Sequence, residues 1–115
     1  MKKELGKINS VRFGLGGYQD AMFGLSLSFT FKGGGVNTFE GGTWDCETMV
    51  CDSYCKWTEA DRSKHNDELI RKVSKYLKQG KVDDVTKLKG LPVELVFDQE
   101  HFGTLKSWRI LEEVL

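Results

Sequence analysis

The sequence predicts an α+β fold in which an antiparallel sheet, built from an N-terminal meander and C-terminal strands, carries a helix pair packed on one face. Three patterns predict this fold. Apolar and small residues alternate from Met22 to Phe31, an apolar stripe with helical spacing follows Thr58, and alternation returns in VELVF near the C-terminus. A chain of 115 residues without repeats or a linker is expected to form one domain, residues 1–115.

The first forty-odd residues predict a meander of three strands. Residues 8–13 are expected to form a short strand, 22–31 a longer one and 36–44 a third, with turns at 14–21 and 33–35. Period-2 alternation places every second side chain of the middle strand on one buried face. The residues expected on that face are Phe23, Leu25, Leu27, Phe29 and Phe31.

The middle of the chain predicts two helices. Thr58 is a good N-cap for the first helix, and Asp61 is spaced to complete a capping box with it. Gly80 is expected to end this helix in the left-handed conformation, and residues 83–89 are expected to form a second, short helix. The expected apolar stripe of the first helix is Leu69, Ile70, Val73, Tyr76 and Leu77.

The charge balance excludes some function classes. Seventeen basic and seventeen acidic residues give a net charge of zero, which argues against binding nucleic acid or membrane by bulk charge. The first residues are not followed by an apolar run, so the sequence predicts no signal peptide, and no segment approaches the roughly 20 apolar residues of a membrane span. We therefore expect a cytoplasmic protein with reduced cysteines. Near-zero net charge also favours a homo-oligomer.

Gly14, Gly16 and Gly17 resemble a loop that holds a phosphate. A phosphate loop leads into a helix, whereas these glycines lead into a strand, and Gly-Lys-Ser/Thr is absent. Two interpretations remain. The glycines form a wide hairpin turn with positive φ or a bulge, or the amides of the turn face an anionic ligand. The candidate ligand-binding residues in this turn are Gly16, Gly17, Tyr18, Gln19 and Asp20.

Arg12, Trp108 and Arg109 are further candidates for ligand binding. An aromatic face beside an arginine can stack a base and bind a phosphate at once. On a strand, however, Trp108 and Arg109 point to opposite faces, so the alternative is core packing of Trp108 with solvated cations beside it.

Cys46, Cys51 and Cys55, together with His65, are weak candidates for a structural zinc site. Three thiolates and an imidazole would satisfy tetrahedral zinc, but the spacing is loose and no C-x2-C pair is present. Free thiols are the favoured interpretation, so we predict neither a metal nor another cofactor. Because no nucleophile, base and orienting group can be identified together, we predict no enzyme and no catalytic residue.

Several segments carry a resemblance to a known family. GGYQDAMFGLSLSF, LKGLPVELVF and LKSWRILEEVL resemble a family of small proteins encoded by tailed phages and prophages, over nearly the whole chain. The cysteines are not part of that pattern. The order of strands and helices also looks like that of phage Thoeris anti-defence proteins, which sequester nucleotide signals.

The resemblance implies a phage setting, so the expected compartment is the cytoplasm of a host cell. Together with the candidate residues, it also implies a function. We expect a non-enzymatic accessory protein that counters host defence by binding and sequestering a nucleotide-derived signal. The alternative is a protein-binding inhibitor, or a replication accessory protein, that acts through a protein–protein interface.

Overall fold

The computed structural model describes residues 2–17, 22–44, 58–98 and 104–115, and these form an antiparallel sheet with one α-helix. The α+β class is therefore confirmed. The elements are β1 (Lys2–Gly16), β2 (Met22–Phe31), β3 (Gly34–Trp44), α1 (Glu59–Gly80), the 3-10 turn η2 (Val85–Leu88), β4 (Pro92–Phe97), β5 (Leu105–Ile110) and the 3-10 turn η3 (Glu112–Val114).

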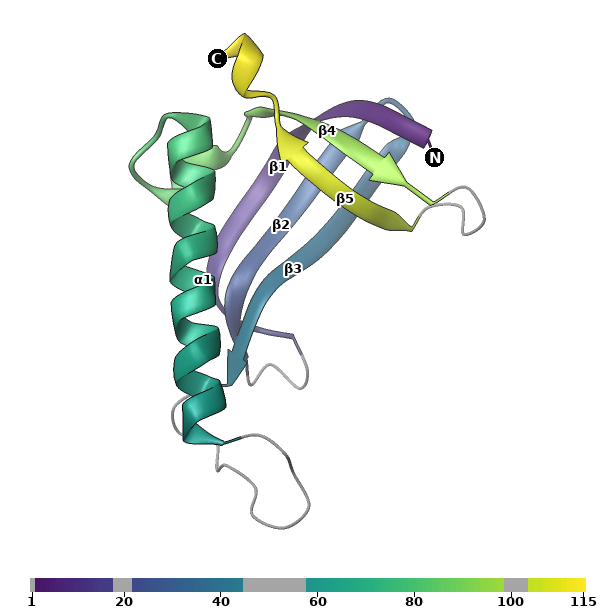
Figure 1. Ribbon diagram of the computed structural model, residues 1–115. Coiled ribbons are helices and arrows are strands. Elements are labelled where there is room, and N and C mark those ends of the chain that lie inside the picture. Colours follow the sequence, from purple (N-terminus) through teal and green to yellow (C-terminus); the bar gives the residue numbers. More distant parts are fainter. Residues whose placement is uncertain (1, 18–21, 45–57, 99–103) are drawn as a thin grey trace.

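The sheet has the strand order β3-β2-β1-β4-β5, and every pair is antiparallel. The central strand, β1, pairs with β4 through its first residues, Lys2 to Lys7, and with β2 from Gly6 to its end. Figure 1 shows that the sheet curls strongly, so that the edge strand β5 comes back in front of the other strands. We call the face of the sheet that α1 covers the inner face, and the opposite face the outer face.

The inner face carries the core. Alternate positions of β2 and β4 are buried against Tyr76 of α1 and Leu88 of η2. Burying each large aliphatic side chain contributes about 1.5–3 kcal/mol to folding. The buried apolar residues of this core are Ile8, Leu25, Leu27, Phe29, Tyr76, Leu88, Val93, Leu95, Phe97 and Ile110.

The start of α1 confirms the predicted capping box. The backbone N–H of Asp61 donates to the Thr58 hydroxyl over 3.1 Å, and the Thr58 N–H donates to the Asp61 carboxylate over 2.9 Å. The predicted end is wrong by one residue, because Lys81 holds the left-handed conformation, at φ 57°. Gly80 is instead buried, and a Cβ atom there would lie 2.7 Å from Cδ1 of Leu91.

The predicted helix pair is wrong, because residues 83–89 form only the 3-10 turn η2. Asp84 is extended, at φ −148°, and its carboxylate accepts the N–H of Thr86 over 2.8 Å. Such a local side-chain bond competes with the helical backbone pattern. Leu88 is the buried residue of this short segment, and a single 3-10 turn is enough to place its side chain in the core.

Two further expectations need correction. β1 begins at Lys2 and runs to Gly16, so Gly14 and Gly16 belong to the strand and not to its turn. Pairing with β2 on one side and β4 on the other extends the strand in both directions. On α1, Ile70 lies outside the apolar stripe, 62% exposed, because the helix touches the sheet through the faces of Leu69 and Tyr76.

The helices among the described residues include none that is long and apolar enough to cross a membrane.

Candidate functional site

A shallow groove of about 760 Å³ runs across the outer face of the sheet, over β1, β2 and β3. Its volume lies in the usual range of small-molecule sites. It lies opposite the core, because its outward-facing side chains, such as Arg12, Ser26 and Phe39, alternate with the buried residues of the same strands. The groove is lined by Ser10, Val11, Arg12, Gly16, Gly17, Ser26, Leu27, Ser28, Asn37, Thr38 and Phe39.

Arg12 supplies the only charge among the lining residues that the structure describes. Its side chain is exposed and folds along β1, so that a Cβ atom on Gly14 would lie 3.0 Å from Nη1. Nη2 donates to the backbone carbonyl of Leu15 over 2.6 Å. This bond holds the guanidinium at the groove and leaves its other N–H groups available to an anion.

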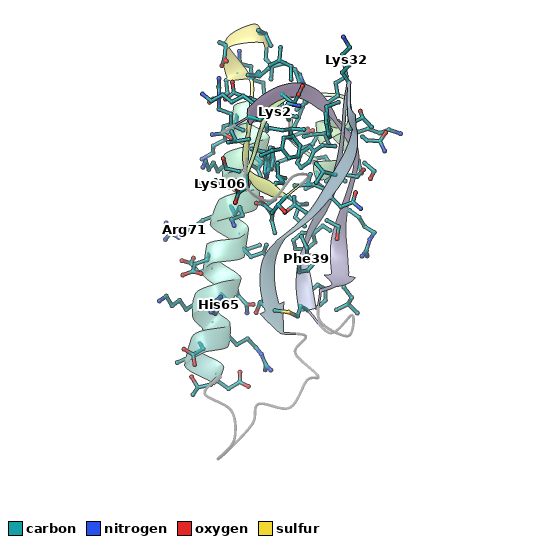
Figure 2. The ribbon with its side chains drawn as sticks, turned by 90° about the vertical axis from the view of Figure 1, so that its right-hand side faces the viewer. Lys2, Lys32, Phe39, His65, Arg71 and Lys106 are labelled. Atoms are coloured by element: carbon teal, nitrogen blue, oxygen red, sulfur yellow. The ribbon has the colours of Figure 1, made fainter. Side chains whose placement is uncertain are left out.

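The glycines make room for the ring of Phe39. A Cβ atom on Gly24 would lie 2.5 Å from Cζ of Phe39, and one on Gly16 would lie 3.0 Å from Cε1. Gly17 touches the same ring and has a positive φ of 67°. The ring therefore crosses β2 and reaches the end of β1, on the side of the sheet away from the helix that carries His65 and Arg71 (Figure 2).

Small polar side chains form the floor of the groove. The hydroxyls of Ser10 and Ser28 share a hydrogen bond of 2.5 Å, and the amide of Asn9 donates to the Ser28 hydroxyl over 3.3 Å. Ser26 lies one pleat further along β2, between Arg12 on β1 and Phe39 on β3. A groove with one cation, several hydroxyls and one aromatic ring can bind an anionic, partly planar ligand.

Trp108 lies on the inner face, away from this groove. Its Nε1–H donates to the carboxylate of Glu40 over 2.6 Å, and its ring lies 4.9 Å from that of Phe29. The hydroxyl of Tyr76 donates to the second carboxylate oxygen of Glu40, and Lys72 Nζ lies 3.7 Å from that oxygen. We call Glu40, Lys72, Tyr76 and Trp108 the clasp, because they join β3, α1 and β5.

The clasp is built to hold a negative charge that is mostly buried. The Glu40 side chain is 14% exposed, and two neutral donors and a nearby ammonium group surround it. Burial, and the hydrogen bond to the Glu40 carboxylate, raise the pKa of Tyr76 well above its usual value. Tyr76 therefore remains a neutral donor at physiological pH. Every described polar group in the clasp has a partner, so the clasp acts as a structural connection between the two edge strands.

Arg109 lies on the outer face of β5, as the alternation predicted. Its guanidinium pairs with Glu94 over 3.2 Å and with Glu113 over 3.0 Å, and these carboxylates raise its pKa. Within one chain, then, the structure brings Arg12, Gly16 and Gly17 together, but it turns Trp108 inward and engages Arg109 elsewhere.

The remaining candidates are only partly described. Tyr18, Gln19 and Asp20 lie outside the described residues, and so do Cys46, Cys51 and Cys55. His65 lies on α1 with its side chain 40% exposed, and its Nδ1 is 3.6 Å from the Glu68 carboxylate. The part of the chain that the structure describes holds no cluster of three metal-ligating side chains.

The sequence analysis missed Ser26, Asn37, Phe39 and Glu40. In β2, small residues alternate with the apolar ones. This pattern indicates that the outer face carries short side chains, and these leave room for the groove. The position of Phe39 over the glycines, and the pairing of Glu40 with Trp108, depend on strand register and on the curl of the sheet. Comparison of the chain with protein-family models, with curated protein sequences and with solved structures finds no match.

Proposed function

We propose that this protein is a non-enzymatic binding protein whose outer groove takes a nucleotide-derived anion. The observation that carries the proposal is the position of the Arg12 guanidinium beside a floor of serine hydroxyls, with the Phe39 ring at the same groove. A phosphate would bind to the guanidinium and hydroxyls, and a base or ribose would lie against the ring.

The biological role that fits this chemistry is sequestration of a nucleotide signal, with the phage setting drawn from the family resemblance. A sequestering protein needs affinity and a preformed surface but no catalytic group. The hydrogen bond from Arg12 to the Leu15 carbonyl, and the packing of Phe39 over Gly16 and Gly24, give the groove that preformed character.

The proposal is tested with a panel of cyclic dinucleotides, cyclic trinucleotides and ADP-ribose derivatives. Thermal shift identifies a binding member, and isothermal titration calorimetry then compares the wild type with Arg12→Gln. Loss of hydrogen bonds to a charged group costs about 1.5–3 kcal/mol, so we expect affinity to fall by roughly ten- to a hundredfold.

The matched control is Arg71→Gln, which removes an exposed arginine from α1 whose partner is Asp67 at 2.7 Å. This variant should bind like the wild type. Failure of every ligand to shift the melting temperature would overturn the proposal. A stoichiometric protein captured from infected cells, with no nucleotide retained, would favour the alternative of a protein-binding inhibitor or replication accessory protein.

A further inference from the structure

Among the described residues, the second half of β1 has an open edge. Ile8 exchanges two backbone hydrogen bonds with the segment before β4, accepting from Gly90 over 2.7 Å and donating to Leu91 over 3.0 Å. Beyond Ile8, β1 pairs with β2 on one side, and none of the described strands pairs with residues 9–16 on the other. Figure 1 shows β4 and β5 crossing only the upper part of the sheet.

The backbone groups on this edge can be assigned from the ladder. Backbone N–H and C=O groups of successive residues point to opposite sides of a strand. Ile8 faces β4, and after the bulge at residue 9 the groups of Val11, Phe13 and Leu15 face the open side. The Leu15 carbonyl supports this assignment, because it accepts a bond from the Arg12 side chain.

The side chains beside the open edge are apolar and exposed. Phe13 is 42% exposed and Leu15 is 43% exposed, on the inner face beyond the reach of α1. The segment 9–16 has one charged residue, Arg12, which points to the outer face. An open edge with apolar side chains is a template for another strand.

The other two edges are protected in the usual ways. β5 has six residues, carries Lys106 and Arg109, and is interrupted by a bulge in its pairing with β4. The pairing of β3 with β2 is also bulged, between Phe23 and Gly24. Charges, short length and bulges discourage strand addition, so the open edge of β1 is the least protected of those described.

We propose that the open edge of β1 is a homodimer interface, in which the same segment of a second copy pairs with it in the antiparallel direction about a twofold axis at Phe13. In this register Phe13 faces Phe13 of the second copy, and Val11 faces its Leu15, whose carbonyl has one lone pair for the Val11 N–H and one for the bond from Arg12. On the outer face Arg12 faces the second copy's Gly14. Apolar side chains meet apolar ones, and the arginine meets a residue without a side chain.

Two neighbouring registers, with the axis at Arg12 or at Val11, are less complementary. An axis at Arg12 places two guanidinium groups opposite each other, and like charges in facing positions destabilise a strand pair. An axis at Val11 extends the pairing as far as Lys7, whose edge is already paired with Pro92 of β4. The zero net charge of the chain offers little repulsion to two copies.

Sedimentation analysis of the wild type and of charge variants at Phe13 tests the interface. The wild type should dimerise. Phe13→Lys and Phe13→Glu alone should each weaken dimerisation by more than about tenfold, because like charges then face each other. An equimolar mixture of these two variants should dimerise again, since opposite charges meet at the axis. Ile70→Lys, at a 62% exposed position on α1, is the matched control and should remain dimeric.

A wild type that stays monomeric at all concentrations would overturn the proposal, and so would a mixture that dimerises no better than its components. Hydrogen exchange on the wild type gives a second test that needs no variant. The amides of Val11 and Phe13 should become protected as protein concentration rises, and protection that does not depend on concentration would contradict the interface. Neither test uses a nucleotide, so the result is independent of the proposed ligand.

Discussion

Replacing the mostly buried Glu40 by alanine should destabilise the fold more than replacing any other carboxylate among the described residues. Glu40 accepts from Tyr76, which is buried, and from Trp108, which is partly buried, and its removal leaves both donors without an acceptor. Each buried donor left unpaired costs about 1–3 kcal/mol, so the sum is roughly 2–6 kcal/mol. A native domain has about 5–15 kcal/mol in total, so the loss would be a large fraction of the stability.

Glu40→Gln separates the charge of the clasp from its shape. The amide oxygen can still accept from Trp108, and the amide nitrogen can donate to the Tyr76 hydroxyl oxygen, so Trp108 keeps its acceptor. The Tyr76 O–H loses its acceptor, for a cost of about 1–3 kcal/mol. We therefore expect the order of stability to be wild type, then glutamine, then alanine.

Urea denaturation followed by far-UV circular dichroism measures these differences. Glu94→Ala is the matched control, because Glu94 also lies on a strand and accepts from a β5 residue, Arg109, but on the exposed outer face. It should change the free energy of unfolding little, since exposed ion pairs contribute little. If Glu40→Ala were as stable as the control, to within about 1 kcal/mol, the clasp would not connect the two edge strands.

Three further predictions concern single positions. Lys81→Gly should raise the free energy of unfolding in urea by about 0.5–1 kcal/mol, because the backbone of Lys81 is in the left-handed conformation that glycine favours. Lys78→Gly, inside α1, should lower it by a similar amount. Gly24→Ala should cost about 1–3 kcal/mol and lower the melting temperature, since its Cβ would meet the Phe39 ring; an unchanged melting temperature would refute that packing. The capping hydrogen bonds lower the pKa of Asp61, so their contribution is complete above its ordinary value of 3.8 and lost below it. Asp61→Asn should therefore flatten the fall in stability on acidification, and an unaltered pH profile would contradict the capping role.

The strands and the start of the helix were predictable because local patterns specify them. The alternation from Met22 onward is a local pattern, and it appears in the structure as β2. The capping box needs only the spacing of Thr58 and Asp61, which can be read directly from the sequence. Residues 83–89 misled because they have helical apolar spacing. Asp84 is extended and its carboxylate caps η2, so the helical residues begin only at Val85 and end at Leu88.

The candidate site was predictable in part. Arg12, Gly16 and Gly17 lie together because they are neighbours on one strand, so sequence distance is a good guide to their distance in space. Trp108 is different, because its partner Glu40 lies 68 residues away and meets it only after the sheet has curled. No local pattern encodes that curl, so the sequence could offer only core packing or ligand binding for Trp108.

A nuclear magnetic resonance titration of the isotope-labelled protein tests the proposed binding groove most directly. The probe is whichever cyclic nucleotide or ADP-ribose derivative gives the largest thermal shift. We expect the backbone signals of Arg12, Ser26, Asn37 and Phe39 to move together and to saturate, while those of the clasp stay in place. Movement confined to α1 or to β5, or no movement at saturating ligand, would contradict a ligand site on the outer face of the sheet.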